Sequence, residues 1–540
     1  MKQLNVIDEG FLIAESREMP MHVGCVSLYD LPAGVNEQEF LHELAANLRD
    51  AEALVPPFGD HLHTGRMGLA GATFWEPDPA LDLEYHVRHS ALPKPGRYRE
   101  LFTLVSRLHG TLLERSRPLW EMHLIEGLQN RQFAVYTKAH HAAVDGARSV
   151  HVMRSMLSAD PDYRLEDSPL SLRAWEEYKA SIKMGKRPDY TASEMRAVTD
   201  IIKQTFDSSS NIYQAVKGFA QAWSGRGSGL KFPHLDVPTS SLNTKISGSR
   251  RFVAQSWPFE RIKAVGAALD GTFNDAVLAM CAGALRLHFQ SQGEIPTDSL
   301  KAMVPMSLRQ AGDVDSGNAV ASISADLATH VEDPIVRFRA IQQSVQAGKE
   351  YYRLMTPSEI ELFTLIMQTP SLVLMPAGLI DRYPPYNLVI SNVPGIRQPM
   401  YWNGARLTGN YPLSIITDGM ALNITLVTYA QNVDFGIIAC RRSVPQVQRL
   451  IDYMEESLQE LEDVAGIKAK PAKRKAAAKK PAAKRPAAKK AKAKPKAKAA
   501  AKPKAKTKAK AKPKAKAKAR PKVKAKRKAT PKVKPKLAAG

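Results

Sequence analysis

The composition of the chain changes abruptly near residue 467. From Lys468 to the carboxyl terminus there are 33 Lys and Arg residues and no Asp or Glu, in a repeat of Ala, Lys and Pro. Such a segment has almost nothing apolar to bury, and its like charges repel one another. Residues 467–540 are therefore predicted to be a disordered, extended tail, and only the residues before them can build a folded core.

The formal net charge of +24 comes entirely from this tail, because the other residues carry 44 Lys and Arg against 53 Asp and Glu. The body, about 465 residues long, exceeds one ordinary hydrophobic core, so two domains are expected. Its three cysteines lie far apart, which argues against a disulfide framework and fits a reducing compartment. The amino terminus is acidic and no cleanly apolar run of about 18 residues occurs, so we expect a cytoplasmic protein without a signal peptide or membrane span.

Residues 1–160 and 246–466 both mix strand-like and helix-like runs, so an α/β fold with mixed sheets is predicted in each half. The region 161–245 is polar and mainly helical, and it is interpreted as a linker or as a third, small helical domain. An active site is expected in the cleft between the two halves. Helices are predicted over 37–54, 97–115, 147–157 and a closing segment from 447 to 461, and strands over 23–29, 133–140, 300–304, 387–391, 422–429 and 435–440.

One apolar stretch, residues 362–380, is interrupted by Gln368, Pro370 and Pro376. It is interpreted as a buried helix, loop and strand, and the alternative is an apolar surface that touches lipid.

The strongest chemical signal is a histidine pair at a strand end. His140 and His141 follow an apolar run and are followed by Asp145 and Gly146. An imidazole is the side chain best suited to accept a proton near neutral pH. Asp145 could cap the helix that follows, and Gly146 could allow a tight turn into it. No H-E-x-x-H or paired C-x-x-C pattern occurs, so no metal site is predicted.

The histidine segment matches the HHxxxDG motif of coenzyme-A-dependent acyltransferases, which condensation domains of peptide synthetases share. Together with further segments, it resembles the bacterial wax ester synthase/diacylglycerol acyltransferase family over residues 1–465. The matching segments are Ile7-Asp8, Pro20-Met21-His22-Val23-Gly24, Pro118-Leu119-Trp120, Leu242-Asn243, Asn274-Asp275, Ser391-Asn392-Val393-Pro394-Gly395 and Ala421-Leu422-Asn423-Ile424.

This resemblance implies two chloramphenicol-acetyltransferase-like domains with a tunnel at their interface. It also implies transfer of a fatty acyl group from acyl-CoA, a co-substrate, to diacylglycerol or a long-chain alcohol, giving triacylglycerol or wax ester. No bound cofactor is implied. A protein with these substrates and no membrane span is expected at the periphery of the inner membrane or of lipid droplets. Nothing in the sequence specifies an oligomeric state.

Within this resemblance, His141 is the expected general base, because an alcohol is a poor nucleophile until it loses its proton. His140 is expected to shape the site or to orient His141. Asp145 is interpreted as structural, with a relay role as the alternative. Asn274 is a candidate donor to the tetrahedral oxyanion, with a helix N-cap as the alternative.

Two other functions compete with the lipid acyltransferase. One is a condensation-type acyltransferase that uses a carrier-protein thioester, although the chain has no carrier domain. The other is a non-catalytic scaffold that coats lipid droplets and is tethered to DNA by its tail.

The tail itself resembles the Lys-Ala-Pro-rich, linker-histone-like tails of some bacterial proteins. A polycation binds polyanions by counterion release with little sequence preference, which favours DNA. An anionic membrane or droplet surface is the alternative partner. A solubilising extension without a specific partner is the third interpretation.

Overall fold

The computed structural model describes residues 2–4, 6–64, 73–144, 146–165, 167–181, 237–294, 297–307, 320–353, 374 and 378–467. Residues Met1–Pro471 form one compact unit by themselves. Its described residues form two six-stranded sheets and a small three-stranded one, so the predicted α/β class with mixed sheets is confirmed. Among the described residues, no helix is long and apolar enough to cross a membrane, and no cluster of three or more His, Cys, Asp or Glu side chains is placed to hold a metal ion.

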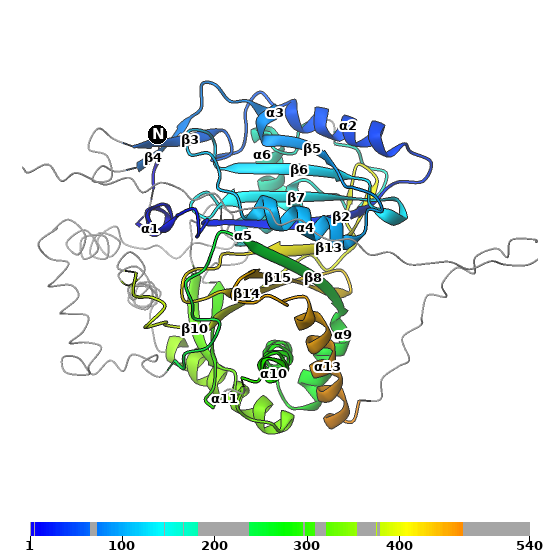
Figure 1. Ribbon diagram of the computed structural model, residues 1–540. Helices are drawn as coiled ribbons and strands as arrows, with labels where there is room; N and C mark the ends of the chain where they lie inside the picture. Colours follow the sequence, from blue (N-terminus) through cyan, green and yellow to red (C-terminus); the bar gives the residue numbers. More distant parts are fainter. Residues whose placement is uncertain are drawn as a thin grey trace, which may run out of the picture. The chain divides into compact units, whose positions relative to one another are not determined.

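The first large sheet is built mainly from the amino-terminal half (Figure 1). Its central strands β2 and β7 are antiparallel, and their register pairs His22 with His140. The strand order is β12 (Tyr401–Trp402), β13 (Ala405–Leu413), β2 (His22–Asp30), β7 (Gln132–His140), β6 (Trp120–Glu126) and β5 (Val87–Ala91).

Two amphipathic helices cover opposite faces of this sheet. Helix α2 (Glu37–Arg49) buries Phe40, Leu41 and Leu44 against one face. Helix α4 (Tyr98–His109) buries Leu101 and Val105 against the other face, and its outer side contacts the second sheet. Side chains of a strand alternate between the two faces, so each face receives its own set of β7 residues.

The second large sheet is mixed, with β11 parallel to β9 and to β14 and the other pairs antiparallel. Its order is β10 (Val320–Asp326), β9 (Lys301–Ser307), β11 (Leu388–Val393), β14 (Leu422–Tyr429), β15 (Asn432–Cys440) and β8 (Arg250–Pro258). Helices α9 (Phe259–Ala268), α10 (Phe273–Gln292), α11 (Pro334–Arg353) and α13 (Arg449–Val464) share one hydrophobic core with it.

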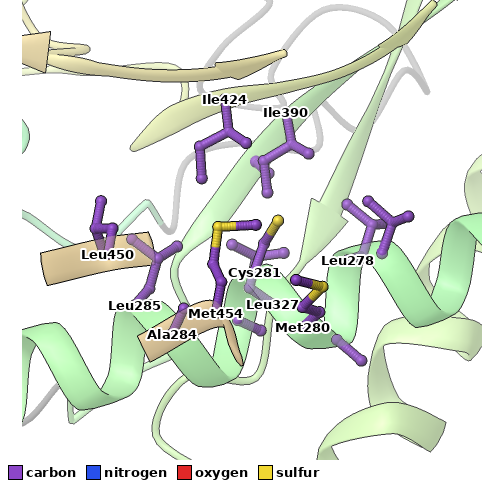
Figure 2. Packing of buried hydrophobic residues seen from close by; sticks show 14 of the residues in the cluster. Leu278, Met280, Cys281, Ala284, Leu285, Leu327, Ile390, Ile424, Leu450 and Met454 are labelled. Carbon is purple, nitrogen blue, oxygen red and sulfur yellow. The ribbon is translucent and has the colours of Figure 1, made fainter. Parts of the chain in front are cut away.

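Helix α10 lies at the centre of that core and is buried over most of its length. Figure 2 shows Met280, Cys281 and Leu285 of α10 facing Ile390 and Ile424 of the sheet and Leu450 and Met454 of α13. An apolar helix is expected to be buried all round in this way. The second half therefore has a core of its own.

Strand β13 joins the two large sheets. It belongs by sequence to the second half, yet it pairs along its length with β2 of the first sheet. It also packs against β14 and β15 of the second sheet. At Gly436 of β15 a Cβ atom would collide with the carbonyl oxygen of Pro412 in β13, so only glycine permits this close approach.

A buried polar chain crosses the same boundary. The Ser256 hydroxyl donates to Asp434 Oδ1 at 2.6 Å, and the Asn410 amide N–H donates to Asp434 Oδ2 at 2.7 Å. The side-chain oxygen of Asn410 in turn accepts from the Ser27 hydroxyl at 2.9 Å and from the Cys25 thiol at 2.8 Å. Asp434 is completely buried, and this burial raises the pKa of its carboxyl group to about 7, although the hydrogen bonds act against the rise.

Most predicted elements are observed, with shifted ends. The helix predicted over 37–54 ends at Arg49, because Asp50 leaves the helical backbone conformation and forms the C-cap. The helix predicted over 97–115 ends at His109, where Gly110 forms the C-cap. The hairpin of β14 and β15 has a shorter turn than predicted, because Tyr429 already pairs with Asn432 and Ala430 adopts a positive φ. The stretch 362–380 lies mostly outside the described residues.

The burial of Asp434 predicts a specific pH dependence of stability. The pKa of the Asp434 carboxyl group is higher in the folded than in the unfolded chain. Its contribution to the free energy of unfolding is therefore intact below about pH 4. As pH rises through 7, the free energy of unfolding falls by up to about 4 kcal/mol. We expect Asp434→Asn to lose less thermal stability than the parent between pH 5 and pH 8, because its side chain does not ionise. The carboxamide oxygen can still accept from the Asn410 N–H, and the NH2 group can donate to the Ser256 hydroxyl oxygen. Thermal unfolding at several pH values measures this, with the exposed Asp452→Asn as control. Parallel pH curves for parent and Asp434→Asn would contradict the assignment.

Candidate functional site

The two histidines lie at the end of β7, where the strand passes into a tight turn. The His140 amide N–H donates to the carbonyl of Leu119 at 2.9 Å, and the His141 N–H donates to that of Met21 at 2.8 Å. The amides of Ala143 and Val144 both donate back to the His140 carbonyl. Backbone hydrogen bonds from the residue before β6, from the residue before β2 and from within the turn therefore hold this histidine turn, residues 140–144. Helix α5 (Gly146–Ser155) follows it.

His140 is fully buried and both of its ring nitrogens face protein groups. Its Nδ1 accepts the Ala142 amide N–H at 3.1 Å, so the proton of the neutral ring is placed on Nε2. That Nε2 lies 3.5 Å from Glu15 Oε1. Because His140 has no exposed surface, it is suited to hold the turn and not to meet a substrate.

Glu15 is the charged partner behind His140. Its carboxylate accepts the Met21 amide N–H at 3.1 Å and the Arg115 guanidinium at 3.0 Å. Burial alone would raise the pKa of Glu15, but His140, the Met21 amide and Arg115 outweigh burial and lower it. A carboxylate that stays ionised in a buried position gives the turn a fixed negative charge.

His141 is half-buried, in contrast to its neighbour. The ring of Phe11 stacks on its imidazole, with centroids 4.2 Å apart and planes at 21°. Phe11 comes from α1 (Val6–Ala14), the first helix of the chain (Figure 1). The amino-terminal segment therefore forms one wall of the site.

A satellite apolar cluster fixes this segment to the histidine turn. It contains Leu12 of α1 and Ala142 of the turn, packed with residues of neighbouring elements. The cluster continues into a small sheet in which β1 (Lys2–Gln3) pairs with β4 (Thr73–Pro77), and β4 with β3 (Asp60–Thr64). The other buried members are Leu4, Trp75, Leu113 and Leu119.

A layer of buried polar side chains continues from His140 along the face of β7 that α4 covers. Lys138 Nζ lies 3.1 Å from Glu121 Oε2, and it donates to the carbonyls of Leu108 and Thr111. Burial lowers the pKa of Lys138, and Glu121 only partly offsets this effect. Burial acts to raise the pKa of Glu121, but His123, Lys138 and Arg88 lower it to about 2.

Two further buried histidines of this layer, His22 and His109, are not suited to be bases near neutral pH. Burial and the neighbouring charges lower the pKa of His22 well below its usual value, and they lower that of His109 to about 3. His22 Nε2 lies 2.8 Å from the carbonyl of His109, whose Nδ1 lies 2.9 Å from the Tyr136 hydroxyl. These rings act as neutral packing and hydrogen-bonding groups.

Asn274 belongs to the second half of the chain, at the start of α10. It is the second residue of α10 and is half-buried. The alternative that it caps the helix is wrong, because Thr272 is the N-cap and its hydroxyl forms a capping box with Asp275. In the part of the chain that the structure describes, no hydrogen bond joins the Asn274 side chain to the histidine turn.

Two other motif segments form hydrogen bonds that hold loops of the second half in place. The Asn243 side chain links three loops, because it donates to the carbonyls of Tyr386 and Gly419 and accepts from the Asn387 amide. Gly395 follows β11, and its carbonyl accepts from Arg154 at the end of α5 at 3.3 Å. This contact connects the helix after the histidine turn to the second sheet.

The structure thus brings His140, His141 and the start of α5 at Gly146 together, as the sequence pattern predicts. Asp145 lies outside the described residues. Phe11 and Glu15 were missed by sequence reasoning. Neither stands in a pattern that announces a contact with residues more than 100 positions away, and only the matching Ile7-Asp8 segment pointed to this part of the chain.

Comparisons with known proteins identify the family. A family model for the wax ester synthase/diacylglycerol acyltransferase catalytic domain matches residues 4–277, and a model for the WS/DGAT C-terminal domain matches 316–462. A probable diacylglycerol O-acyltransferase, tgs2, of Mycobacterium tuberculosis is 43% identical over 463 residues, which cover 85% of this chain and 98% of that protein. O-acyltransferase WSD of Acinetobacter baylyi is 37% identical, over 86% of this chain and 98% of that one.

A solved structure supports the same family assignment. The wax ester synthase/diacylglycerol acyltransferase from Marinobacter aquaeolei VT8 superposes with a TM-score of 0.69 at 39% identity, over 86% of this chain and 100% of that one. The first condensation domain of the calcium-dependent antibiotic synthetase shares the fold, with a TM-score of 0.51 at 14% identity. The protein is therefore an acyl-CoA-dependent O-acyltransferase by class. The chain belongs to the wax ester synthase/diacylglycerol acyltransferase family.

The position of Glu15 predicts a stability effect with the opposite sign to that of Asp434. The pKa of Glu15 is lower in the folded than in the unfolded chain. Its contribution to the free energy of unfolding is therefore present above the unfolded-state pKa near 4.5 and is lost as pH falls below that value. We expect Glu15→Gln to lower the thermal midpoint at pH 7, because Arg115 loses its ionic partner, and the difference from the parent to shrink toward pH 4. Thermal unfolding measures this, with the exposed Glu18→Gln as control. A difference that stays constant with pH would contradict the ionic role.

Proposed function

We propose that this protein transfers a fatty acyl group from acyl-CoA to diacylglycerol, to a long-chain alcohol, or to both, giving triacylglycerol or wax ester. The names of its relatives support this substrate class. The observation that carries the proposed mechanism is the contrast between the two histidines. His140 is sealed, with Nδ1 accepting the Ala142 amide N–H and Nε2 facing Glu15 at 3.5 Å, whereas His141 is half-buried at the strand end.

In the proposed reaction His141 accepts the proton of the acceptor hydroxyl as its oxygen attacks the thioester carbon. The new carbon–oxygen bond gives a tetrahedral oxyanion, and its collapse breaks the carbon–sulfur bond. The imidazolium then returns its proton to the coenzyme A thiolate, so that no net proton is consumed. His140 positions the turn, and Asp145 and Gly146 shape the start of α5. Asn274 remains the proposed donor to the oxyanion.

We further propose that the two halves are chloramphenicol-acetyltransferase-like domains over 1–160 and 246–466, connected by residues 161–245, with the substrate tunnel at their interface. The shared β13 and the Arg154–Gly395 contact support a site to which both halves contribute. Diacylglycerol and long-chain alcohols reside in lipid phases, so we place the protein at the periphery of the inner membrane or of lipid droplets. The likeness to condensation domains concerns the fold alone and does not favour a carrier-protein substrate.

The tail, residues 467–540, is proposed to bind polyanions, DNA before anionic lipid. Its 33 basic residues and absence of acidic ones support this. The relatives align over 98–100% of their own length but over only 85–86% of this chain, so the body corresponds to nearly the whole length of these relatives. We therefore assign catalysis to the body and polyanion binding to the tail.

Replacement of the proposed base tests the mechanism. We expect His141→Ala to lower kcat about 10²–10⁴-fold, the usual contribution of a positioned base, without a change in thermal stability. Product formation from palmitoyl-CoA with either hexadecanol or diacylglycerol is measured. His63→Ala, which removes an exposed histidine of β3, is the matched control. A folded His141→Ala that esterifies at the parent rate would refute the proposal.

Removal of the tail tests the division of labour. We expect residues 1–466 to keep the acyltransferase rate and to lose a DNA affinity that, in the full chain, falls steeply between about 50 and 200 mM salt. Binding to duplex DNA and to vesicles that contain anionic phospholipid is measured for both proteins. Preferential vesicle binding would make lipid the partner, and loss of catalysis in the truncated chain would contradict the division.

A further inference from the structure

The first helix of the chain is attached to both histidines of the site. Phe11 of α1 stacks on the His141 imidazole, and Glu15, one residue beyond the end of α1, lies 3.5 Å from His140. The two contacts are made by residues four apart in sequence, on a segment far from the histidines along the chain. A single short element therefore holds both rings.

Hydrogen bonds and apolar packing anchor helix α1, so the Phe11 side chain is held in place against His141. Arg115 donates to the carbonyl of Leu12 at 2.6 Å, and Glu9 accepts the amide N–H of Thr73 at 3.1 Å. The Leu12 side chain is buried in the satellite cluster with Ala142 of the histidine turn. Helix α1 is thus tied to the loop after α4, to β4 and to the turn.

We propose that Phe11 is the positioning residue of the general base. This inference rests on the proposed role of His141 and extends it. At a centroid separation of 4.2 Å with nearly parallel planes, the two rings are in van der Waals contact, so the imidazole cannot turn about its ring torsion without displacing an anchored side chain. The phenyl ring thereby keeps the base in one orientation for attack by the hydroxyl.

The phenyl ring has a second effect once the base has accepted the proton. The face of an aromatic ring carries negative electrostatic potential and attracts a cation placed over it. Stacking on Phe11 therefore favours the imidazolium that forms as the hydroxyl is deprotonated. An aliphatic side chain of similar size would still cover the imidazole, but it would supply neither the flat contact nor this attraction.

The test separates kcat from KM. Because Phe11 acts through the base and not on the substrate, Phe11→Leu should lower kcat roughly tenfold and leave KM for palmitoyl-CoA and for the acceptor within about twofold. Phe11→Tyr, which keeps the aromatic face, should recover most of the lost rate. Ile13→Ala is the matched control on the same helix, because Ile13 is 59% exposed.

A double-mutant cycle shows whether the effect passes through His141. In a His141→Ala background, Phe11→Leu should cause no further loss of the residual rate, because its target is absent. Thermal midpoints of all variants are measured alongside, so that a folding defect is separated from a catalytic one.

Three results would overturn the inference: a parent-like kcat for Phe11→Leu while His141→Ala is inactive, a change confined to KM, or losses that add in the double variant. A parent-like His141→Ala would instead refute the general-base proposal itself, so the two failures are distinguishable.

Discussion

The pairing of β13 with β2 is the constraint on which the site depends. This strand comes from the second half of the chain and completes the sheet of the first. It makes β2 an interior strand, held on its other side by β7 in a register that sets His22 opposite His140. A slip of one residue in this register would turn every side chain of β7 to the opposite face. The histidine turn therefore owes its position to a strand more than 250 residues further along the chain.

The surroundings of the histidine turn depend, second, on a layer of buried charged side chains between the first sheet and α4. In an ordinary sheet such a layer would be apolar. Lys138 and Glu121 are both buried between β6, β7 and α4, and each is held by several hydrogen bonds. A buried ion pair is a poor source of stability, because desolvation cancels much of its attraction. Its retention beside His140 is better explained by the fixed polar surroundings that it provides at the strand end than by any gain in folding energy.

Sequence reasoning succeeded where the signal is local and failed where it is not. The strands ending at His140 and spanning 422–429 have the alternation or apolar run that a sheet imposes, and both were predicted. Helix α1 has only nine residues, too few for a clear period, and it was missed. Phe11 and Glu15 acquire their roles only through contacts across the fold. For Asn274 only the alternative of a helix N-cap is wrong, because Thr272 and Asp275 form the capping box. Its role as an oxyanion donor stays a prediction.

The anchoring of the first fifteen residues has a practical and an evolutionary consequence. A fusion partner or added sequence ahead of α1 would be attached directly to the helix that packs against the histidine turn. Helix α13 instead ends at Val464, whose side chain is exposed, and the neighbouring Leu461 and Ile467 pack on the core of the second half. Appendages are thus better tolerated behind the body than in front of it, and the lysine-rich extension of this chain occupies the permissive end.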